Sequence, residues 1–501
     1  MNKKILTLFV LLALLVGSCT DFLAVNEVNP NRASKVPGSL LLPGALNNIA
    51  YTMNNPRRFD FVYIWHGLWC ISSGYSQNAV LAQYRLLNSS YPFNFTELYT
   101  AGQNLVEIEK ASTDPKEASY LAIAMIMKAY IMQNLVDCYG NVPYSEAFKT
   151  DEGILKPKYD DQKTIYEDLI VKLDAAIKLI QDRPADATEI LAASDIMFGG
   201  DMTLWAKFAN TLKLRMLVHQ SGMAGRDTYI KTAIATTASV GYLGAGESAL
   251  VNPGFSKSTG KMSPFYEIFY KTDGTTQSDG ITYYNAGKDV VDFMNDVADP
   301  RISHFFNPYA GTSFAGNSVG ITDPAPRTAA LTSKLGYVPG SNDYMIGNFD
   351  KSAPILTDFE SLFIQAEAVE RGFITGTGKA LYESAITQSF AYFGLSAAQA
   401  GAFLATEKTS VNYDLATSKL NLILDQKWVS LNGIAPMEIW TDYRRSGRPA
   451  NITFSKDPNV ANATPPVRLL YPQREISTNN DNVVAVGKID AFTSKIFWQN
   501  R

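Results

Sequence analysis

The chain has 501 residues, of which 46% are hydrophobic and 18% charged, with 44 Lys+Arg against 48 Asp+Glu. This hydrophobic content is sufficient for a large core, and the mild negative charge gives no electrostatic reason to expect nucleic-acid binding. Three cysteines are too few for a disulfide framework in a chain of this size.

Residues 1–18 are typical of a secretory signal peptide. Two lysines precede an apolar run from Ile5 to Val16, which is too short to span a bilayer as a helix, since that takes roughly 20 residues. Small residues directly before Cys19 indicate a lipoprotein signal, in which the Cys19 thiol is acylated and becomes the new N-terminus. The alternative is a plain secreted protein in which Cys19 is incidental. Removal of the two signal lysines leaves a mature chain with a net charge of about −6.

The remaining cysteines and the histidines give no sign of a metal centre. Cys70 and Cys138 lie in apolar surroundings, which favours buried free thiols over a disulfide between them. His66, His219 and His304 are scattered, and none has a second histidine or a cysteine at ligand spacing. Neither a zinc site nor a histidine-based catalytic triad is expected. We assign no metal, no cofactor and no catalytic residue.

Helical periodicity dominates the first half of the chain. Residues 118–136 are apolar on nearly every side, but Lys128 and a later Gln-Asn pair favour a buried core helix over a membrane span. One apolar stripe predicts an amphipathic helix over 163–181. Another stripe starts at Trp205 and ends at Gly222, a residue that commonly terminates helices.

A second helical group lies nearer the C-terminus. Thr357-Asp358-Phe359-Glu360 fits a capping box, and the helix that follows is expected to stop at Gly372. Further helices are predicted over roughly 379–393 and 418–432, with a short one after Pro436. The pairing of helices resembles tetratricopeptide packing, although the sequence has no clean repeat of that length.

Two segments differ in residue composition from the predicted helices. Between about 241 and 350, Gly, Ser, Thr, Asn, Pro and Tyr dominate, and a similar aromatic-rich, irregular region is predicted over 51–99. Loops this long in a compact protein are usually functional or disordered. The chain from Pro449 onward is also expected to be mostly loop.

A series of short motifs follows one another through the chain. They are Asp21-Phe22-Leu23-Ala24-Val25-Asn26, Leu41-Leu42-Pro43-Gly44-Ala45, Asp137-Cys138-Tyr139-Gly140-Asn141-Val142-Pro143-Tyr144, Gly199-Gly200-Asp201-Met202, Asp299-Pro300-Arg301, Leu356-Thr357-Asp358, Gln426-Lys427-Trp428 and Arg444-Arg445-Ser446-Gly447. In this order they resemble the SusD/RagB family of nutrient-binding outer-membrane lipoproteins, most closely its SusD-like subfamily. The likeness covers nearly the whole mature chain. Cys138 departs from the family pattern, which often has Phe there.

The resemblance implies a mainly α-helical fold. Tetratricopeptide-like helix pairs form a scaffold, expected mainly at 94–240 and 355–447, and a loop-rich insert of about 241–350 belongs to an irregular ligand-binding lobe. The mature chain, 19–501, is expected to be a single SusD-like domain. The family also implies a cell-surface lipid anchor in the outer membrane and a SusC-type TonB-dependent transporter as partner. To that partner the protein would deliver oligosaccharides, or peptides in some members.

Aromatic residues of the two irregular segments are the candidate ligand contacts. An aromatic face laid against the C–H face of a sugar ring, with a few fixed polar groups, is the usual solution to capturing a sugar in water. The candidates are Trp65, Trp69, Tyr75, Tyr84, Tyr283, Tyr284, Tyr309 and Tyr344, with Asn78, Gln83, Asn285 and Asn342 as hydrogen-bonding groups. The alternative for Trp65 and Trp69, four residues apart, is a core-facing helical stripe.

A charge cluster near two tryptophans permits two interpretations. It comprises Lys427, Glu438, Asp442, Arg444 and Arg445, close to Trp428 and Trp440. We favour an ion-pair and cation–π network that locks the last helices together. A glycoside hydrolase would instead use Glu438 or Asp442 as general acid, but a carboxylate pair of that kind is defined by spatial separation and cannot be read from sequence. We therefore predict a binding protein that is not an enzyme.

Overall fold

The structure is a computed structural model that describes residues 36–277, 280–321 and 328–500. The predicted signal peptide and Cys19 lie outside the described residues. The α-helices are α3 (Gly38–Met53), α4 (Pro56–Trp65), α5 (Ala79–Ala82), α6 (Pro92–Ala111), α7 (Ala118–Tyr139), α8 (Gln162–Gln181), α9 (Met202–His219), α10 (Asp227–Ala235), α11 (Pro264–Phe269), α12 (Gly280–Tyr283), α13 (Lys288–Asp296), α14 (Ile302–Phe305), α15 (Asp358–Glu370), α16 (Gly378–Tyr392), α17 (Ala397–Leu404), α18 (Lys419–Ser430), α19 (Pro436–Ser446), α20 (Gln473–Thr478) and α21 (Asn480–Ala485). The strands are β1 (Trp69–Ile71), β2 (Val142–Pro143), β3 (Tyr159–Asp160), β4 (Ala249–Val251), β5 (Tyr284–Ala286), β6 (Phe306–Asn307), β7 (Lys334–Leu335) and β8 (Ala353–Leu356).

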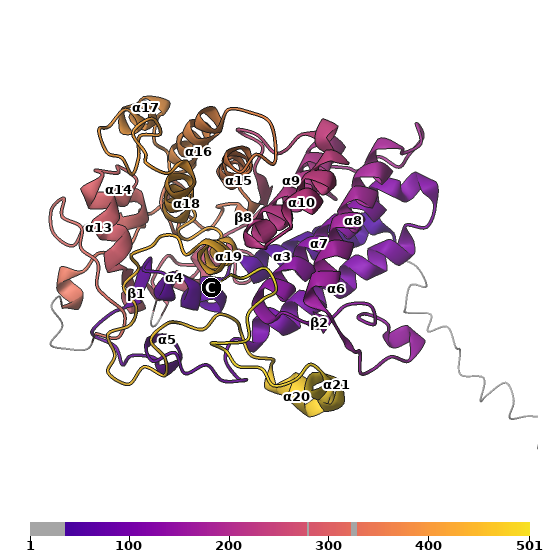
Figure 1. Cartoon of the computed structure of the whole chain (residues 1–501), viewed down its shortest axis with the longest axis horizontal. Coiled ribbons are helices and arrows are strands. Elements are labelled where there is room, and N and C mark those ends of the chain that lie inside the picture. The colour runs from indigo at the N-terminus through magenta and orange to yellow at the C-terminus, as the bar shows by residue number, and fades with distance from the viewer. Residues whose placement is uncertain (1–35, 278–279, 322–327, 501) are drawn as a thin grey trace, which may run out of the picture.

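Helices that follow one another in sequence pack side by side in two groups. Helix α6 packs on α7, α7 on α8 and α8 on α9, and in the second group α15 packs on both α16 and α18. Contacts between α9 and α15 join the groups, and α19 lies at the centre of the molecule (Figure 1). The helices predicted over 118–136, 163–181, 379–393 and 418–432 and after Pro436 are confirmed as α7, α8, α16, α18 and α19.

Helix α7 is the apolar segment that by composition alone resembles a membrane span. Its most apolar window is long enough to cross a bilayer, but 83% of that window is buried inside the protein. Lys128 extends to the neighbouring helix, where its ammonium lies 2.6 Å from the Glu109 carboxylate. The interpretation as a core helix of a helical protein is confirmed.

The prediction of an irregular region over 51–99 is wrong for residues 56–65, which form α4, and for its two ends, which belong to α3 and α6. The side chain of Asn55 accepts a hydrogen bond from the Arg57 amide, and Pro56 occupies the first turn, where its missing N–H costs nothing. Nearly every residue of α4 is buried, so the helix has no polar face and no periodic pattern to reveal it. The Asn-Pro pair was the signal available in the sequence.

The predicted capping box at Thr357 forms only in half. The Thr357 hydroxyl accepts a hydrogen bond from the Glu360 amide at 3.3 Å. The Glu360 carboxylate does not return to the cap, because it accepts a hydrogen bond from Arg215 of α9 at 2.9 Å. A reciprocal capping box is present instead at the start of α17, between Ser396 and Gln399.

A four-stranded antiparallel sheet joins the two segments that were predicted to be irregular. Its strand order is β1-β5-β7-β6, with Cys70 of β1 opposite Asn285 of β5. The sheet therefore brings residues near 70 beside residues near 285, although more than 200 positions separate them. The rest of 241–350 consists of short elements, the longest being the nine-residue helix α13.

Cys70 and Cys138 are both buried and unpaired, as predicted. Cys70 Sγ donates a hydrogen bond to the Ala286 carbonyl of the paired strand at 3.3 Å. Burial raises the pKa of the Cys70 thiol to about 12.

A network of buried ions connects the last helices, as the favoured interpretation of the charge cluster predicted. The Lys427 ammonium lies 2.5 Å from the Glu438 carboxylate and 2.9 Å from the Asp442 carboxylate. Arg445 donates to both oxygens of Glu367 on α15, each at 2.6 Å. Arg444 stacks on the Trp440 ring at 3.8 Å.

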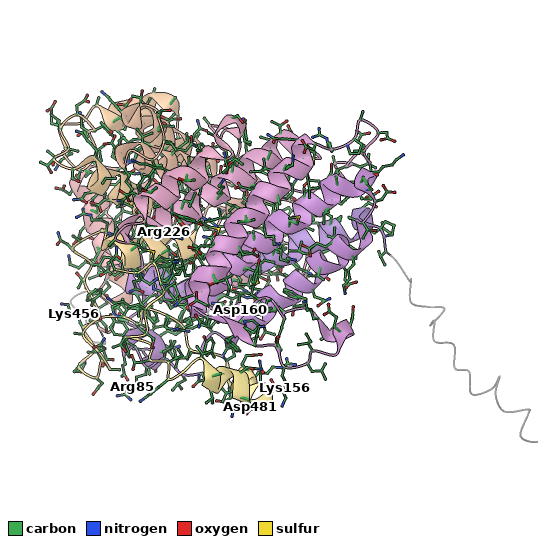
Figure 2. The ribbon with its side chains drawn as sticks, turned by 45° about the vertical axis from the view of Figure 1, so that its right-hand side comes forward. Arg85, Lys156, Asp160, Arg226, Lys456 and Asp481 are labelled. Carbon is green, nitrogen blue, oxygen red and sulfur yellow. The ribbon has the colours of Figure 1, made fainter. Side chains whose placement is uncertain are left out.

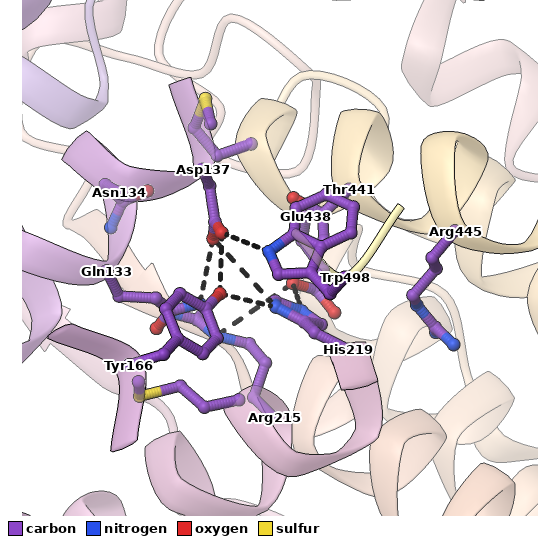
Figure 3. A network of polar contacts seen from close by, with 12 residues as sticks. Gln133, Asn134, Asp137, Tyr166, Arg215, His219, Glu438, Thr441, Arg445 and Trp498 are labelled. Atoms are coloured by element: carbon purple, nitrogen blue, oxygen red, sulfur yellow. Dashed lines mark hydrogen bonds and ion pairs between the residues drawn. The ribbon is translucent and has the colours of Figure 1, made fainter. Parts of the chain in front are cut away.

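The same network continues toward α7, α8 and α9 (Figure 3). His219 contacts the second oxygen of Glu438 at 2.9 Å and the Tyr166 hydroxyl at 3.1 Å. Asp137 accepts hydrogen bonds from Tyr166 at 2.6 Å and from the Trp498 indole at 3.0 Å. Every one of these groups is buried, so a removed partner would leave a desolvated charge or an unsatisfied polar atom.

We expect Glu367→Gln to destabilise the protein by about 3–5 kcal/mol, because the fully buried Arg445 would keep only Asp442 as counter-ion. Burial alone would raise the pKa of Glu367, but Arg445 and Arg371 hold it at about 2. The wild-type contribution is therefore complete above the unfolded pKa and is lost as pH falls toward 2. Urea denaturation between pH 7 and pH 2 measures both effects.

The matched control is Glu383→Gln. Glu383 is 40% exposed and lies 3.8 Å from Lys379, so its removal should cost under about 1 kcal/mol. Equal destabilisation by the two substitutions would contradict a structural role for the buried pair.

Candidate ligand-binding cleft

Four of the eight predicted aromatic contacts are core residues. Trp65, Trp69, Tyr84 and Tyr284 are each at most 2% exposed. The Trp65 indole donates to the Leu81 carbonyl at 3.0 Å, and the Trp69 indole donates to Asn432 Oδ1 at 2.9 Å. Protein covers the ring faces of Trp65, Trp69 and Tyr84, so the expectation that these three rings stack on a ligand is corrected, whereas the small exposed part of Tyr284 lines a surface cleft.

The two tryptophans also do not form one helical stripe. Trp65 ends α4, whereas Trp69 lies in β1. Tryptophan has the largest apolar surface of any side chain and gains most from burial, which explains why both are drawn into the core.

Two of the other candidates meet at the surface. Tyr75 and Tyr283 are both partly exposed, and their rings contact edge to face with centroids 5.3 Å apart. The Tyr75 hydroxyl lies 2.5 Å from Thr282 Oγ1, which ties the first irregular segment to the second. Tyr283 contacts the buried Tyr284 in the same manner at 4.8 Å.

Tyr283 and Tyr284 form one wall of an open cleft with a volume of about 530 Å³. The other lining residues come from the start of α4, from α5 with the residue before it, and from the segment that precedes α6. The lining residues, which we call the tyrosine cleft, are Arg57, Asp60, Asn78, Val80, Leu87, Ser89, Ser90, Tyr91, Tyr283 and Tyr284. Apart from the two tyrosines, only Asn78 of this set was predicted to contact a ligand.

A buried carboxylate holds the floor of the tyrosine cleft in place. The Tyr91 hydroxyl donates to one oxygen of Asp60 at 2.6 Å, and the Tyr284 hydroxyl donates to the other at 2.8 Å. Burial raises the pKa of Asp60 to about 6, although both hydrogen bonds act in the opposite direction. Asp60 thereby fixes two of the rings that line the cleft.

Tyr91 adopts a backbone conformation that such a side chain rarely takes. Its φ of +53° lies in the left-handed region, directly before Pro92 at the start of α6. The bond to Asp60 and the packing of its ring on Phe61, with centroids 4.7 Å apart, hold it there. Strain of this kind is often found at binding sites. The sequence carried no signal for Tyr91 beyond its position before a proline.

A second hollow of about 430 Å³ adjoins the tyrosine cleft. It shares Arg57, Ser89 and Tyr91 with the cleft and continues past Pro92 to Asn94. Phe93 lines it with a ring that is 58% exposed. Solvent-exposed aromatic surface therefore extends beyond the cleft along the start of α6.

The remaining two aromatic candidates lie away from the cleft. Tyr344 stacks on His304 with centroids 5.0 Å apart, and Tyr309 belongs to a tight turn closed by its amide and the Ser313 carbonyl at 3.1 Å. Of the other predicted polar contacts, Asn285 accepts a hydrogen bond from Lys334 at 2.9 Å inside the sheet.

The carboxylates considered for hydrolysis do not face this cleft. Glu438 and Asp442 are 4% and 6% exposed and are bound within the ion network. Burial opposes ionisation, but Lys427 and His219 hold the pKa of Glu438 well below its usual range. An ionised carboxylate has no proton to donate as a general acid. Within the part of the chain that the structure describes, no group of three or more His, Cys, Asp or Glu side chains is placed to bind a metal ion.

Asp60→Asn is expected to remove a pH dependence of stability between about pH 4 and pH 6. The pKa of Asp60 rises from 3.8 to about 6 on folding, so the native state keeps a proton that the unfolded chain releases. Wild-type stability should therefore fall by about 3 kcal/mol as pH rises through this window. The free energy of unfolding, measured by urea titration at several pH values, tests this. The exposed Asp292→Asn is the control, and an unchanged slope in Asp60→Asn would contradict the assignment.

Comparison with known proteins agrees with this architecture. A family model described as "Starch-binding associating with outer membrane" matches residues 30–472. A chitin-binding protein superposes with a TM-score of 0.77 at 19% identity, over 93% of this chain and all of the other. A SusD-like protein from Bacteroides thetaiotaomicron gives 0.74 at 24% identity, over 93% and 99%. A chitin-binding SusD homolog from Flavobacterium johnsoniae gives 0.74 at 22%, over 91% and 98%.

No curated protein matches the sequence. The structural similarities are at low identity and establish a shared fold, which confirms the predicted mainly α-helical, tetratricopeptide-like architecture. The family model covers most of the chain, and the sequence resemblance is confirmed by it. The protein therefore belongs to the SusD-like family, whose members are described as starch-binding and associated with the outer membrane.

Proposed function

We propose that this protein is a cell-surface lipoprotein that binds oligosaccharides and delivers them to a partner TonB-dependent transporter of the outer membrane. The observation that carries the proposal is the tyrosine cleft, where aromatic rings and polar groups meet in an open hollow. The family description and the chitin-binding names of two structural relatives support the same ligand class.

The cleft has the composition that sugar binding requires. The ring of Tyr283 is partly exposed and could stack on the C–H face of a pyranose. The Tyr75 ring contacts it edge to face and so restricts its movement. Asn78 accepts from the Val80 amide with its oxygen at 2.8 Å, which fixes the side chain and leaves its NH₂ group to donate to a hydroxyl. Two serines and Arg57 complete the polar rim.

The bonds from Tyr91 and Tyr284 to Asp60 order the cleft before a ligand arrives. A site that is already ordered loses less conformational entropy on binding, so more of the contact energy appears as affinity. Each sugar unit would contribute little alone, and the rigid floor keeps the rings and hydrogen-bonding groups at a constant spacing. This arrangement suits capture and release, with no chemical change in the ligand.

The proposed location of the protein at the cell surface depends on its N-terminal region. An acylated Cys19 would tether the mature chain, residues 19–501 acting as one domain, to the outer membrane at the cell surface. A SusC-type transporter in the same membrane would receive the bound oligosaccharide. Peptides are the alternative ligand, since the same cleft could hold a tyrosine-contacting peptide with its carboxylate near Arg57.

Tyr283→Ala is expected to weaken oligosaccharide binding by about tenfold, which corresponds to the loss of one stacked ring. Isothermal titration against panels of maltooligosaccharides and chitooligosaccharides measures this, with thermal melting to confirm that the variant is folded. Tyr309→Ala and Tyr344→Ala, which alter rings outside the cleft, serve as matched controls and should bind as the wild type does. The absence of binding to any glycan at millimolar concentration, with mixed peptides raising the melting temperature, would favour the peptide alternative.

Cys19→Ala is expected to abolish lipid attachment and to release the protein from the membrane fraction. The wild type should be removed from intact cells by external protease and should incorporate a labelled fatty acid. A wild-type protein that resists protease on intact cells and carries no lipid would overturn the proposed location.

A further inference from the structure

A third hollow, which we call the α6 groove, lies farther along α6 and was not anticipated from the sequence. It has a volume of about 510 Å³. Its walls come from α6, from the loop that follows β2 and from the C-terminal helix α20. The lining residues are Phe95, Thr96, Tyr99, Thr100, Gln103, Pro143, Ala147, Phe148, Thr150, Pro157, Arg474, Glu475 and Thr478.

One wall of the α6 groove is an aromatic ring held in a strained conformation. Phe148 has a φ of +63°, in the left-handed region that a bulky residue rarely enters. Its ring fits against α6 only because residue 102 is glycine, where an added Cβ would lie 2.6 Å from the ring. Tyr99 packs on the same ring at 5.7 Å, and its hydroxyl donates to the Pro143 carbonyl at 2.6 Å. The Phe148 ring is partly exposed and lines the groove.

The rim of the α6 groove is polar and mostly neutral. Hydroxyl and amide groups surround the aromatic wall, contributed by Thr96, Thr100, Gln103, Thr150 and Thr478. This combination of aromatic surface and neutral hydrogen-bonding groups matches the chemistry of a sugar better than that of a charged ligand.

The C-terminal helices fix the far side of the α6 groove. Tyr159 donates to Glu475 at 2.8 Å, and Asn479 donates to the Pro157 carbonyl at 2.8 Å. Asn482 of α21 donates to the Lys156 carbonyl at 2.9 Å, and Lys156 and Asp481 lie together at the lower edge of the molecule (Figure 2). The groove is therefore bounded by two parts of the chain that are held together by hydrogen bonds.

All three hollows are lined in part by residues of α6 or of the segment directly before it. The tyrosine cleft shares three residues with the hollow at Phe93, and the α6 groove begins at Phe95 on the same helix. Phe93, Thr96, Thr100 and Gln103 are spaced three and four residues apart, so they lie on one face of α6. That face is about 15 Å long, from the rise per residue of an α-helix.

We propose that the α6 groove is a second sugar-binding subsite, and that the three hollows form one track that selects extended glycan chains over short ones. This inference rests on the proposed glycan-binding function. A short oligosaccharide would occupy the tyrosine cleft alone. A longer chain would engage both ends of the track, and the second contact would be intramolecular, so affinity would rise with chain length beyond the gain expected from statistics.

The experiment measures affinity against chain length, with maltooligosaccharides and chitooligosaccharides from trimer to decamer as probes. For whichever series binds, the wild type should show an affinity that rises at least tenfold from short to long members. Phe148→Ala should lose that gain for long members and leave the trimer unaffected. Tyr283→Ala should weaken both.

A second variant guards against misfolding of Phe148→Ala. Thr100 is exposed on α6, so Thr100→Arg would fill the groove without disturbing the core, and it should also abolish the length dependence. Val171→Arg, on the exposed face of α8, is the matched control and should bind as the wild type does. Affinity independent of chain length, or an unchanged length dependence in Thr100→Arg, overturns the inference while glycan binding itself stands. Failure of every glycan to bind would instead refute the proposed function.

Discussion

The fully buried ammonium of Lys427, held between Glu438 and Asp442, is the interaction on which the helical arrangement depends. A charge in that position is tolerated only when its partners are fixed, and those partners are in turn fixed by His219 and Arg445, which reach α9 and α15. Helices from both halves of the chain must therefore be in register before the network is complete.

The binding region depends on a different constraint, the pairing of β1 with β5. This pairing joins only three residues of each strand, yet it sets the first aromatic segment against the second. Asp60 then accepts one hydrogen bond from the Tyr91 hydroxyl and one from the Tyr284 hydroxyl. The geometry of the tyrosine cleft is therefore set by contacts between residues far apart in the sequence. The helical scaffold provides the rigid frame, and loops supply the contacts, as is common for binding proteins.

Residue patterns in the sequence predicted those helices whose exposed and buried faces alternate with helical periodicity. The apolar stripe of α8 was recognised because the other face of this helix is exposed to solvent. Helix α4 was missed because nearly all of its residues are buried. Composition pointed to the two segments that contribute to the cleft and named Tyr75 and Tyr283 as candidate contacts, and their role in binding stays a prediction. It could not separate them from Trp65 and Trp69, because only the folded chain decides which rings are covered. The contact between Asp60 and Tyr284 spans 224 positions, and no spacing in the sequence indicates it.

The two interior cysteines have a consequence for the sensitivity of the fold to oxidants. Cys70 and Cys138 are sealed in the core, and the pKa of each is raised by burial, so that the reactive thiolate is hardly populated at neutral pH. Oxidants and thiol catalysts act on the thiolate. The folded core therefore presents few reactive thiolates to oxidants in its surroundings.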